Sequence, residues 1–269
     1  MTAILCPRCH KLVSPDSDVC IHCGLRKPGL WGITSAIRKL GLSLDIPSAL
    51  SAVCIVLYIT GLLLDPSALL NFNSILRIFS PSMESSFKLG MTGSQPIFRY
   101  DLWWTPITAI YLHGGLLHIF FNVGWIRQLG PIVDRSFGPF RFFIIFTTSG
   151  IIGFLVSALM GNAFTLGASG SIFGLLAAAI VFGRHTGQGL FTRQLLQWAG
   201  LMFIMGFVFP GVDNWAHGGG FVGGYITAQI LARSIGSREG IGTYLGAGIC
   251  MLSTIGAFLL QLFAVWGLI

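Results

Sequence analysis

Long apolar stretches, separated by short polar ones, set the pattern of this chain. Residues 46–64 carry no charged side chain, and a helix of about 20 apolar residues is long enough to cross the hydrocarbon core of a bilayer. Six later stretches are also mostly apolar and lie at residues 116–129, 140–160, 169–182, 195–209, 216–232 and 244–268. The pattern therefore predicts an all-α fold, a polytopic membrane bundle of seven helical spans.

The stretch at residues 169–182 is shorter than a full crossing requires. We therefore expect its helix to start below the outer surface, with residues 161–167 dipping into the protein. Irregular backbone is tolerated at that depth only where it lines a cavity. This part of the chain is thus a candidate for a polar pocket.

The segment between the first two spans, residues 65–114, is too long and too apolar for a plain solvent loop. Phe87, Trp103 and Trp104 supply aromatic rings, which favour the headgroup region of a bilayer. We expect this segment to be partly sunk in the outer membrane interface.

Composition supports a membrane protein, because 54% of the residues are hydrophobic and only 9% are charged. The net charge of +7 does not indicate a nucleic-acid partner, because of where the charges fall. With the N-terminus inside, alternating spans leave only Arg77, Lys88 and Arg99 outside, which is the positive-inside bias. The first thirty residues have no apolar core, so we expect no cleaved signal peptide. We expect the cell (inner) membrane of a prokaryote, a cytosolic N-terminus, a lipid bilayer as partner and no nucleic acid.

Four cysteines near the N-terminus have the spacing of a structural zinc site. Cys6 and Cys9 form one pair and Cys20 and Cys23 the other, each with a two-residue spacer. Disulfide pairing is the alternative, but a cytosolic location disfavours it. Four cysteines leave no open position for water, so the zinc is expected to be structural. We expect a cytosolic zinc ribbon at residues 1–30, with His10 and His22 as bystanders and an unidentified partner, followed by a basic interfacial linker at residues 31–45.

Four polar side chains stand in otherwise apolar surroundings: His118, Asn122, Ser169 and His217. Burying such groups in lipid is costly, so they should face the bundle interior and one another. Serine becomes a nucleophile when a base takes its proton, and histidine titrates near neutrality. His118 and Asn122 are four residues apart on one helix face, where they can donate to an oxyanion together with the backbone N–H of Ser169.

Glycines on two helices provide the geometry for such a meeting. Gly170 and Gly174 share one helix face, as do Gly220 and Gly224, and small residues four apart let membrane helices approach closely. Phe173 lies one turn beyond Ser169, where its ring can stack on an imidazole. The pattern predicts that the helices of Ser169 and His217 pack backbone to backbone.

These motifs resemble those of the rhomboid intramembrane serine proteases. Gly167, Ser169 and Gly170 match the nucleophile pattern Gly-x-Ser-Gly. Ala216, His217, Gly220 and Gly224 match the pattern Ala-His-x-x-Gly-x-x-x-Gly. His113, His118 and Asn122 match the pattern His-x4-His-x3-Asn.

The resemblance implies a six-span catalytic core at residues 46–240 and a seventh span at residues 241–269. It also implies a serine endopeptidase that cleaves transmembrane proteins near the outer face through an acyl-enzyme and needs no cofactor for catalysis. Ser169 and His217 would form a dyad, with His118 and Asn122 as oxyanion donors.

Two positions depart from the family pattern. Many members have a Trp-Arg pair where this chain has Trp103 and Trp104, which puts an arginine-based anchor of the outer segment in doubt. Phe173 replaces a frequent tyrosine, which preserves stacking and removes a phenolic hydrogen bond.

Other interpretations of the same residues remain. A catalytically inactive relative that binds membrane proteins normally lacks the nucleophile or base, and a transporter needs ionisable groups deep in several spans. We read Asp213 as a solvated loop acid rather than a triad member, and His113 as structural or water-binding. Trp198 against Phe121 is a hypothetical lateral gate for substrate.

Overall fold

The structure is a computed structural model, and it describes residues 4–6, 9, 11–14, 17–26, 45–66, 79–209, 211–232, 235, 239–265 and 267. The chain divides into two compact units, Met1–Ala49 and Leu50–Ile269, and each is described by itself. Several sequence predictions fall outside the described residues, namely nearly all of the linker at 31–45, the bystander His10 and the outer-side Arg77.

The N-terminal unit has a core made largely of cysteine. Strands β1 (Ile4–Leu5) and β2 (Leu12–Val13) pair antiparallel, and an isolated bridge joins Val19 to Arg26. Cys6, Val13 and Cys20 are buried, with Cys9, Cys23 and Leu25 packed against them. So small an apolar core supplies little folding free energy, and such modules normally need an additional staple.

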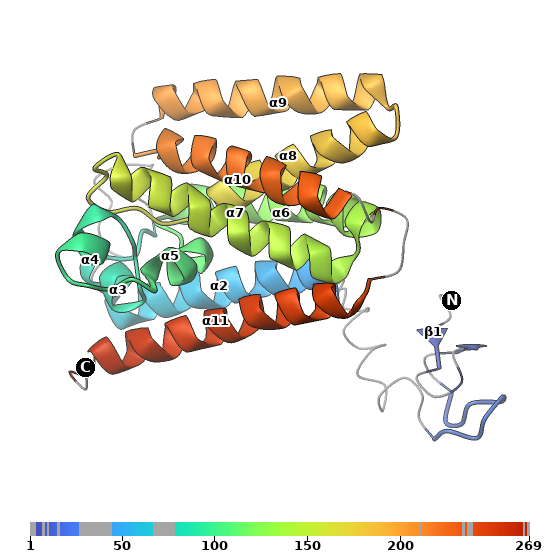
Figure 1. The fold of residues 1–269 in the computed structure, drawn as a ribbon. Coiled ribbons are helices and arrows are strands. Elements are labelled where there is room, and N and C mark those ends of the chain that lie inside the picture. Colours follow the sequence, from blue (N-terminus) through green and yellow to red (C-terminus); the bar gives the residue numbers. More distant parts are fainter. Residues whose placement is uncertain are drawn as a thin grey trace. The chain divides into compact units, whose positions relative to one another are not determined.

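The second unit is helical, which confirms the all-α membrane bundle (Figure 1). Its long helices in the described part of the chain are α2 (Ile46–Leu64), α6 (Leu116–Phe137), α7 (Pro139–Leu159), α8 (Ser169–His185), α9 (Gly189–Val208), α10 (Asn214–Ala232) and α11 (Ile241–Val265). Among the described residues, α2, α7 and α11 are each long and apolar enough to cross a membrane. The segment Thr105–Tyr111 and α6, which meet at 90°, would together make a fourth. The count of seven spans stays a prediction.

Helix α6 extends well beyond the predicted end at residue 129. It continues through Pro131 to Phe137, although a proline removes one helical hydrogen bond. Val133 and Phe137 on this last part are buried, and their packing offsets the missing bond. By contrast, α2 matches its predicted bounds, and α8 is confirmed as a short apolar helix.

The segment before α6 folds into short helices, which the sequence pattern did not predict. These are α3 (Met83–Lys88), α4 (Ser94–Phe98), α5 (Thr105–Thr108) and the 3₁₀ helix η4 (Ala109–Tyr111). Figure 1 shows α3, α4 and α5 gathered at one end of the bundle. We call the described residues 79–111 the outer segment; its insertion in the membrane interface remains a prediction.

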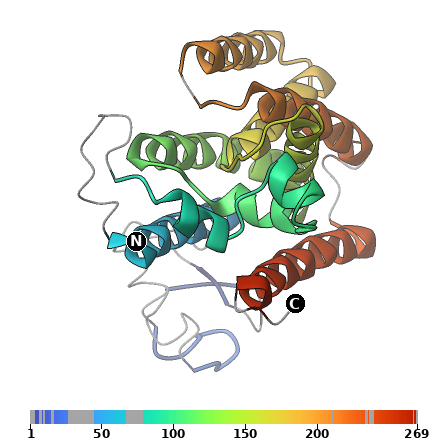
Figure 2. The same ribbon diagram turned by 90° about the vertical axis from the view of Figure 1, so that its left-hand side faces the viewer.

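Helix α8 lies at the centre of the bundle. Its residues from Gly170 to Val181 are all buried, and it packs against α6, α7, α9 and α10. Figures 1 and 2 both place α9 and α11 on opposite sides of this central group. Ser169 therefore begins a helix that neighbours enclose almost completely.

Candidate active site

Ser169 is the first residue of α8, and the turn before it requires glycine. Gly167 has a φ of +129°, which L-residues rarely adopt, and its N–H donates to the Ala109 carbonyl at 2.9 Å. The helix begins with the Ile172 N–H donating to the Ala168 carbonyl, so the Ser169 N–H has no partner within the helix. Ser169 itself is half-buried, whereas its neighbours Ala168 and Gly170 are buried. Its hydroxyl thus stands at the free, positive end of a buried helix.

The imidazole of His118 lies directly over Gly167. A Cβ atom at Gly167 would stand 2.7 Å from both Cε1 and Nε2 of His118. The Nδ1 of His118 accepts a hydrogen bond from the Gly114 N–H at 3.3 Å. A neutral ring that accepts through Nδ1 carries its proton on Nε2, so the donor faces the turn that precedes Ser169.

Asn122 lies one turn after His118 and is buried. Its Nδ2 donates to the His118 carbonyl at 2.8 Å, which leaves a second amide hydrogen free, and its buried Oδ1 has no partner among the described residues. His118 and Asn122 therefore share a helix face, as predicted from their spacing.

His217 lies near the start of α10, and its ring stacks on that of Phe173. The ring centroids are 4.4 Å apart with an interplanar angle of 21°. Only 6% of His217 is exposed, and its Nδ1 has no hydrogen-bond partner in the described part of the chain. The stacking expected for Phe173 is thus present, and it fixes the plane of the imidazole.

The backbones of α8 and α10 touch on both sides of this stack. A Cβ at Gly170 would stand 3.2 Å from the Ala216 carbonyl oxygen, and one at Gly220 would stand 2.8 Å from the Gly170 Cα. A Cβ at Gly224 would collide with the backbone of Gly174. This contact confirms the predicted close packing of the two glycine pairs, on the helices that carry Ser169 and His217.

Within the described residues, no hydrogen bond is recorded between the Ser169 hydroxyl and His217. Catalytic hydrogen bonds are often long or poorly aligned without substrate and tighten when it binds. The contact that the structure shows beside Ser169 is the stacking of His217 on Phe173, one turn further along α8.

The contacts of Asp213 contradict its interpretation as a solvated loop acid. It is half-buried, its Oδ1 accepts from the Ala216 N–H at 3.0 Å and from Asn162 Nδ2 at 2.8 Å, and its Oδ2 accepts from the Ser157 hydroxyl. The carboxylate therefore caps the start of α10 and ties it to the end of α7. The sequence placed Asp213 correctly in a turn, but its partners Ser157 and Asn162 lie more than fifty residues away.

Several further residues of the site carried weaker signals in the sequence. His113 is buried with its ring 5.1 Å from that of His118, edge to face, and so packs against a proposed donor. On α7, a Cβ at Gly153 would stand 2.6 Å from the Ala216 carbonyl oxygen. Small residues in the third span were the available signal for this contact.

The aromatic contact between α6 and α9 differs from the one suggested by the sequence. The ring of Trp198 lies 5.6 Å from that of Trp125, one turn beyond Phe121. Phe121 instead pairs with its neighbour Phe120 and is exposed. Trp125, rather than Phe121, is therefore the ring that faces Trp198.

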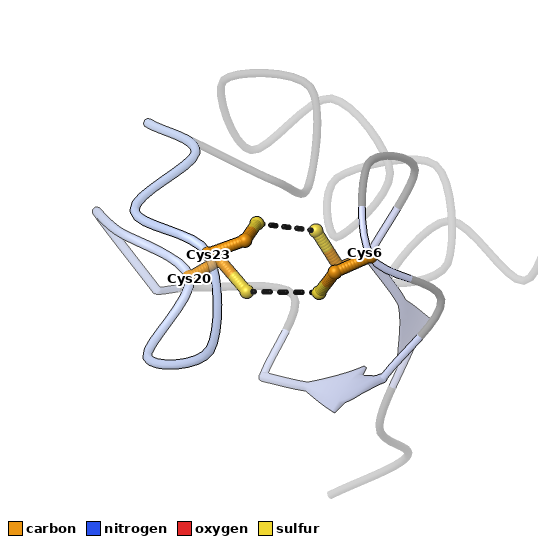
Figure 3. Close-up of side chains that lie close together, drawn as sticks. Cys6, Cys20 and Cys23 are labelled. Atoms are coloured by element: carbon orange, nitrogen blue, oxygen red, sulfur yellow. Dashed lines mark hydrogen bonds between the residues drawn. The ribbon is translucent and has the colours of Figure 1, made fainter.

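In the N-terminal unit, the four predicted zinc ligands form one cluster. The sulfurs of Cys6, Cys9, Cys20 and Cys23 all lie within 4.8 Å of one another. The Cys6–Cys23 and Cys9–Cys20 sulfur pairs are each 3.7 Å apart, and Figure 3 shows the sulfurs pointing toward a common centre. Sulfurs bound at about 2.3 Å around a tetrahedral zinc lie about 3.8 Å from one another, so the cluster fits that ion.

The crowding of the sulfurs also affects the acidity of a thiol in this cluster. The backbone hydrogen bond with Leu25 lowers the pKa of Cys23. Desolvation and the neighbouring cysteines raise it by more, so that the pKa of this thiol is raised to about 12. A bound cation reverses this effect, because it stabilises the thiolate form.

Residues 100–234, which include every proposed residue of the membrane site, match the family model of the rhomboid domain. The chain belongs to the rhomboid family. It is 31% identical over 160 residues to RHOMBOID-like protein 7 of Arabidopsis thaliana, covering 57% of this chain and 51% of that protein. It is 33% identical over 133 residues to the rhomboid protease GluP of Bacillus subtilis, covering 48% of this chain and 26% of that protein.

A third relative is a fungal protein. The chain is 32% identical over 151 residues to rhomboid-type serine protease 2 of Emericella nidulans, covering 53% of this chain and 30% of that protein. The matches thus span from about a quarter to about half of these rhomboid proteins, and they establish that this chain is an integral membrane protein of the family.

Proposed function

We propose that this rhomboid is a serine-type endopeptidase that cleaves transmembrane proteins through a dyad of Ser169 and His217. The packing of the His217 ring on Phe173, one turn after Ser169, is the observation that carries the proposal. Two relatives are named as a rhomboid protease and a rhomboid-type serine protease, which supports the same reaction class.

In the proposed reaction, His217 takes the proton of the Ser169 hydroxyl as its oxygen attacks the carbonyl carbon of the scissile bond. His217 then protonates the departing amine, the C–N bond breaks, and an ester to Ser169 remains. His217 next takes a proton from water, whose oxygen attacks the ester carbon. The C–O bond to Ser169 then breaks, His217 returns the proton to the Ser169 oxygen, and the acid leaves. No cofactor enters these steps.

Three groups are proposed to stabilise the oxyanion that forms in each half of the reaction. They are the free N–H of Ser169, the Nε2–H of His118 and the remaining amide hydrogen of Asn122. The orientation of His118 supports this role, because its accepting nitrogen is already occupied by Gly114. Gly167, Gly170, Gly220 and Gly224 support the site by permitting the close approach, with His113 packed behind His118.

We further propose that substrates enter from the bilayer and are cut near the outer face. A helical carbonyl is hydrogen-bonded and shielded, so helix-breaking or small residues at the cut should favour cleavage. The positive-inside bias supports a cytosolic N-terminus for a six-span core at residues 46–240 plus a seventh span at residues 241–269. A prokaryotic membrane stays a prediction, since the relatives are plant, bacterial and fungal proteins.

The cysteine cluster is proposed to hold a structural zinc ion in a ribbon at residues 1–30. Cys6, Cys9, Cys20 and Cys23 would bind it as thiolates, and the ion would supply folding free energy that the small core lacks. His22 is not part of the cluster.

The test uses purified full-length protein in liposomes with a single-span substrate and a fluorophosphonate probe. We expect cleavage and labelling of the wild type, and loss of both in Ser169→Ala. His217→Ala should also abolish cleavage. Cleavage retained in either variant, with the fold intact, would rule out the dyad; a folded wild type that neither cleaves nor labels would favour a binding protein.

A further variant separates a dyad from a triad. Asp213→Asn keeps an oxygen for the Ala216 N–H, so a capping role predicts near-normal kcat. An acid that orients the imidazole of a triad is worth about 10⁴-fold in kcat, so a loss of that size would overturn the capping role.

A further inference from the structure

Among the three buried residues of helix α11, one has a polar side chain. Only 3% of Gln261 is exposed, although most of α11 faces away from the bundle. Its Nε2 donates to the Phe87 and Lys88 carbonyls at 2.9 and 3.2 Å, and its Oε1 accepts from Trp104 Nε1 at 2.9 Å. A single amide thus binds two separate parts of the outer segment.

The two carbonyls lie at the end of α3, where that of Phe87 also accepts from the Gly90 N–H at 3.0 Å. Phe87 and Lys88 are the last residues of α3, and the last carbonyls of a helix lack intrahelical donors. The amide of Gln261 supplies both donor hydrogens there. A close fit is also evident at Gly90, where a Cβ would stand 3.3 Å from Gln261 Cγ.

The outer segment in turn holds the loop that leads to Ser169. Thr92 and Thr165 exchange backbone hydrogen bonds at 3.1 and 2.7 Å. The N–H groups of Ser94 and Gln95 donate to the Asn162 and Ala163 carbonyls at 2.7 and 3.2 Å. Four backbone bonds therefore connect the outer segment to residues 162–165, only four residues before Ser169.

We propose that Gln261 is a positioning residue, through which the C-terminal helix fixes the outer segment and, by way of residues 162–165, the turn at Ser169. The indole N–H of Trp104 makes this contact from the outer segment to α11. The effect of Gln261 on catalysis rests on the proposed function, whereas its effect on the outer segment does not.

A simple packing role for Gln261 makes a different prediction. If Gln261 only seals α11 against the bundle, a leucine of similar size should serve as well or better, because it removes a buried polar group. If Gln261 positions the outer segment, leucine leaves the Lys88 carbonyl and the Trp104 indole N–H without this partner. The Phe87 carbonyl keeps only its bond from the Gly90 N–H, and the segment loosens.

The test compares Gln261→Leu, Trp104→Phe and their double variant in the full chain, with Leu262→Ala as control. Leu262 is the next residue on α11 and is about half exposed. Hydrogen exchange of the amides at Thr92, Ser94, Gln95 and Thr165 reports the anchor without requiring activity. The kcat and KM for a single-span substrate, and the rate of fluorophosphonate labelling, report the consequence at Ser169.

For Gln261→Leu we expect faster exchange at those amides and a kcat lowered by about tenfold to about 100-fold, because small misplacements of a reacting group cost that much. The double variant should be little worse than Gln261→Leu alone, because that change already removes the contact with Trp104. Unchanged exchange in Gln261→Leu would overturn the anchor. Faster exchange with unchanged kcat and labelling would overturn the link to Ser169. A wild type without proteolysis would refute the proposed function alone, since exchange still tests the anchor.

Discussion

At the scale of single residues, Gly167 combines two constraints that mutation can separate. Its φ of +129° strains any other residue, and a Cβ there would also collide with His118. Gly161 has a φ of +89° but open space around its Cβ position. The two glycines therefore form a matched pair for testing whether the position of His118 matters to the reaction.

We expect Gly167→Ala to lower kcat by about 100-fold, the scale of losing one oxyanion donor, because the methyl group displaces His118. Gly161→Ala should lower only the unfolding temperature, through backbone strain. Kinetics and thermal unfolding of both variants in the same detergent provide the check. Equal kcat losses in the two variants would show that strain, not displacement of His118, is responsible.

The residues of the site differ in how far the sequence could identify them. Ser169, His217, His118 and Asn122 stand out because a polar group in an apolar span needs a partner. The roles of Asp213 and Gln261 were not predictable in the same way. Apart from the cap on the Ala216 N–H, their contacts join residues 51 to 174 positions apart, which come close only when the helices have packed.

At the scale of elements, the contact between α8 and α10 is the tightest part of the site. The glycine spacing predicted this contact, because it depends on period and residue size alone. The true end of α6 was not predictable from the pattern, since buried Val133 and Phe137 carry the helix past Pro131. Local pattern thus located the elements, and tertiary packing set where one of them stops.

Gly220→Ala tests this contact directly. Its added methyl group would meet the Gly170 backbone, so we expect the helices to separate at a cost of about 1–3 kcal/mol in unfolding free energy, with activity lost as well. Gly218→Ala lies on the same helix, where the nearest atom to a Cβ is 3.9 Å away, and should be tolerated. Equilibrium unfolding of both variants provides the comparison. If the two variants were equally stable, α8 and α10 would be able to move apart at no cost in unfolding free energy, which would contradict close packing of their backbones.

At the scale of the whole molecule, the chain combines a membrane unit with a small unit that has its own core. Each should respond separately when its own stabilising interactions are removed. The membrane unit depends on helix packing, whereas the N-terminal unit depends on four sulfurs within 4.8 Å of one another. Metal removal therefore tests the independence of the two.

We expect the double variant Cys6→Ser/Cys9→Ser to lose bound zinc and to expose residues 1–30 to added protease, because the metal supplies most of the folding free energy there. Metal content by mass spectrometry and limited proteolysis measure this. Cleavage of a single-span substrate by the purified variant should match the wild type, since every proposed catalytic group lies between residues 118 and 217. Cys54→Ser is the matched control, because this cysteine lies in α2, outside the cluster. If the double variant lost proteolysis together with its zinc while Cys54→Ser kept its proteolysis, the ribbon would be coupled to catalysis rather than independent of it.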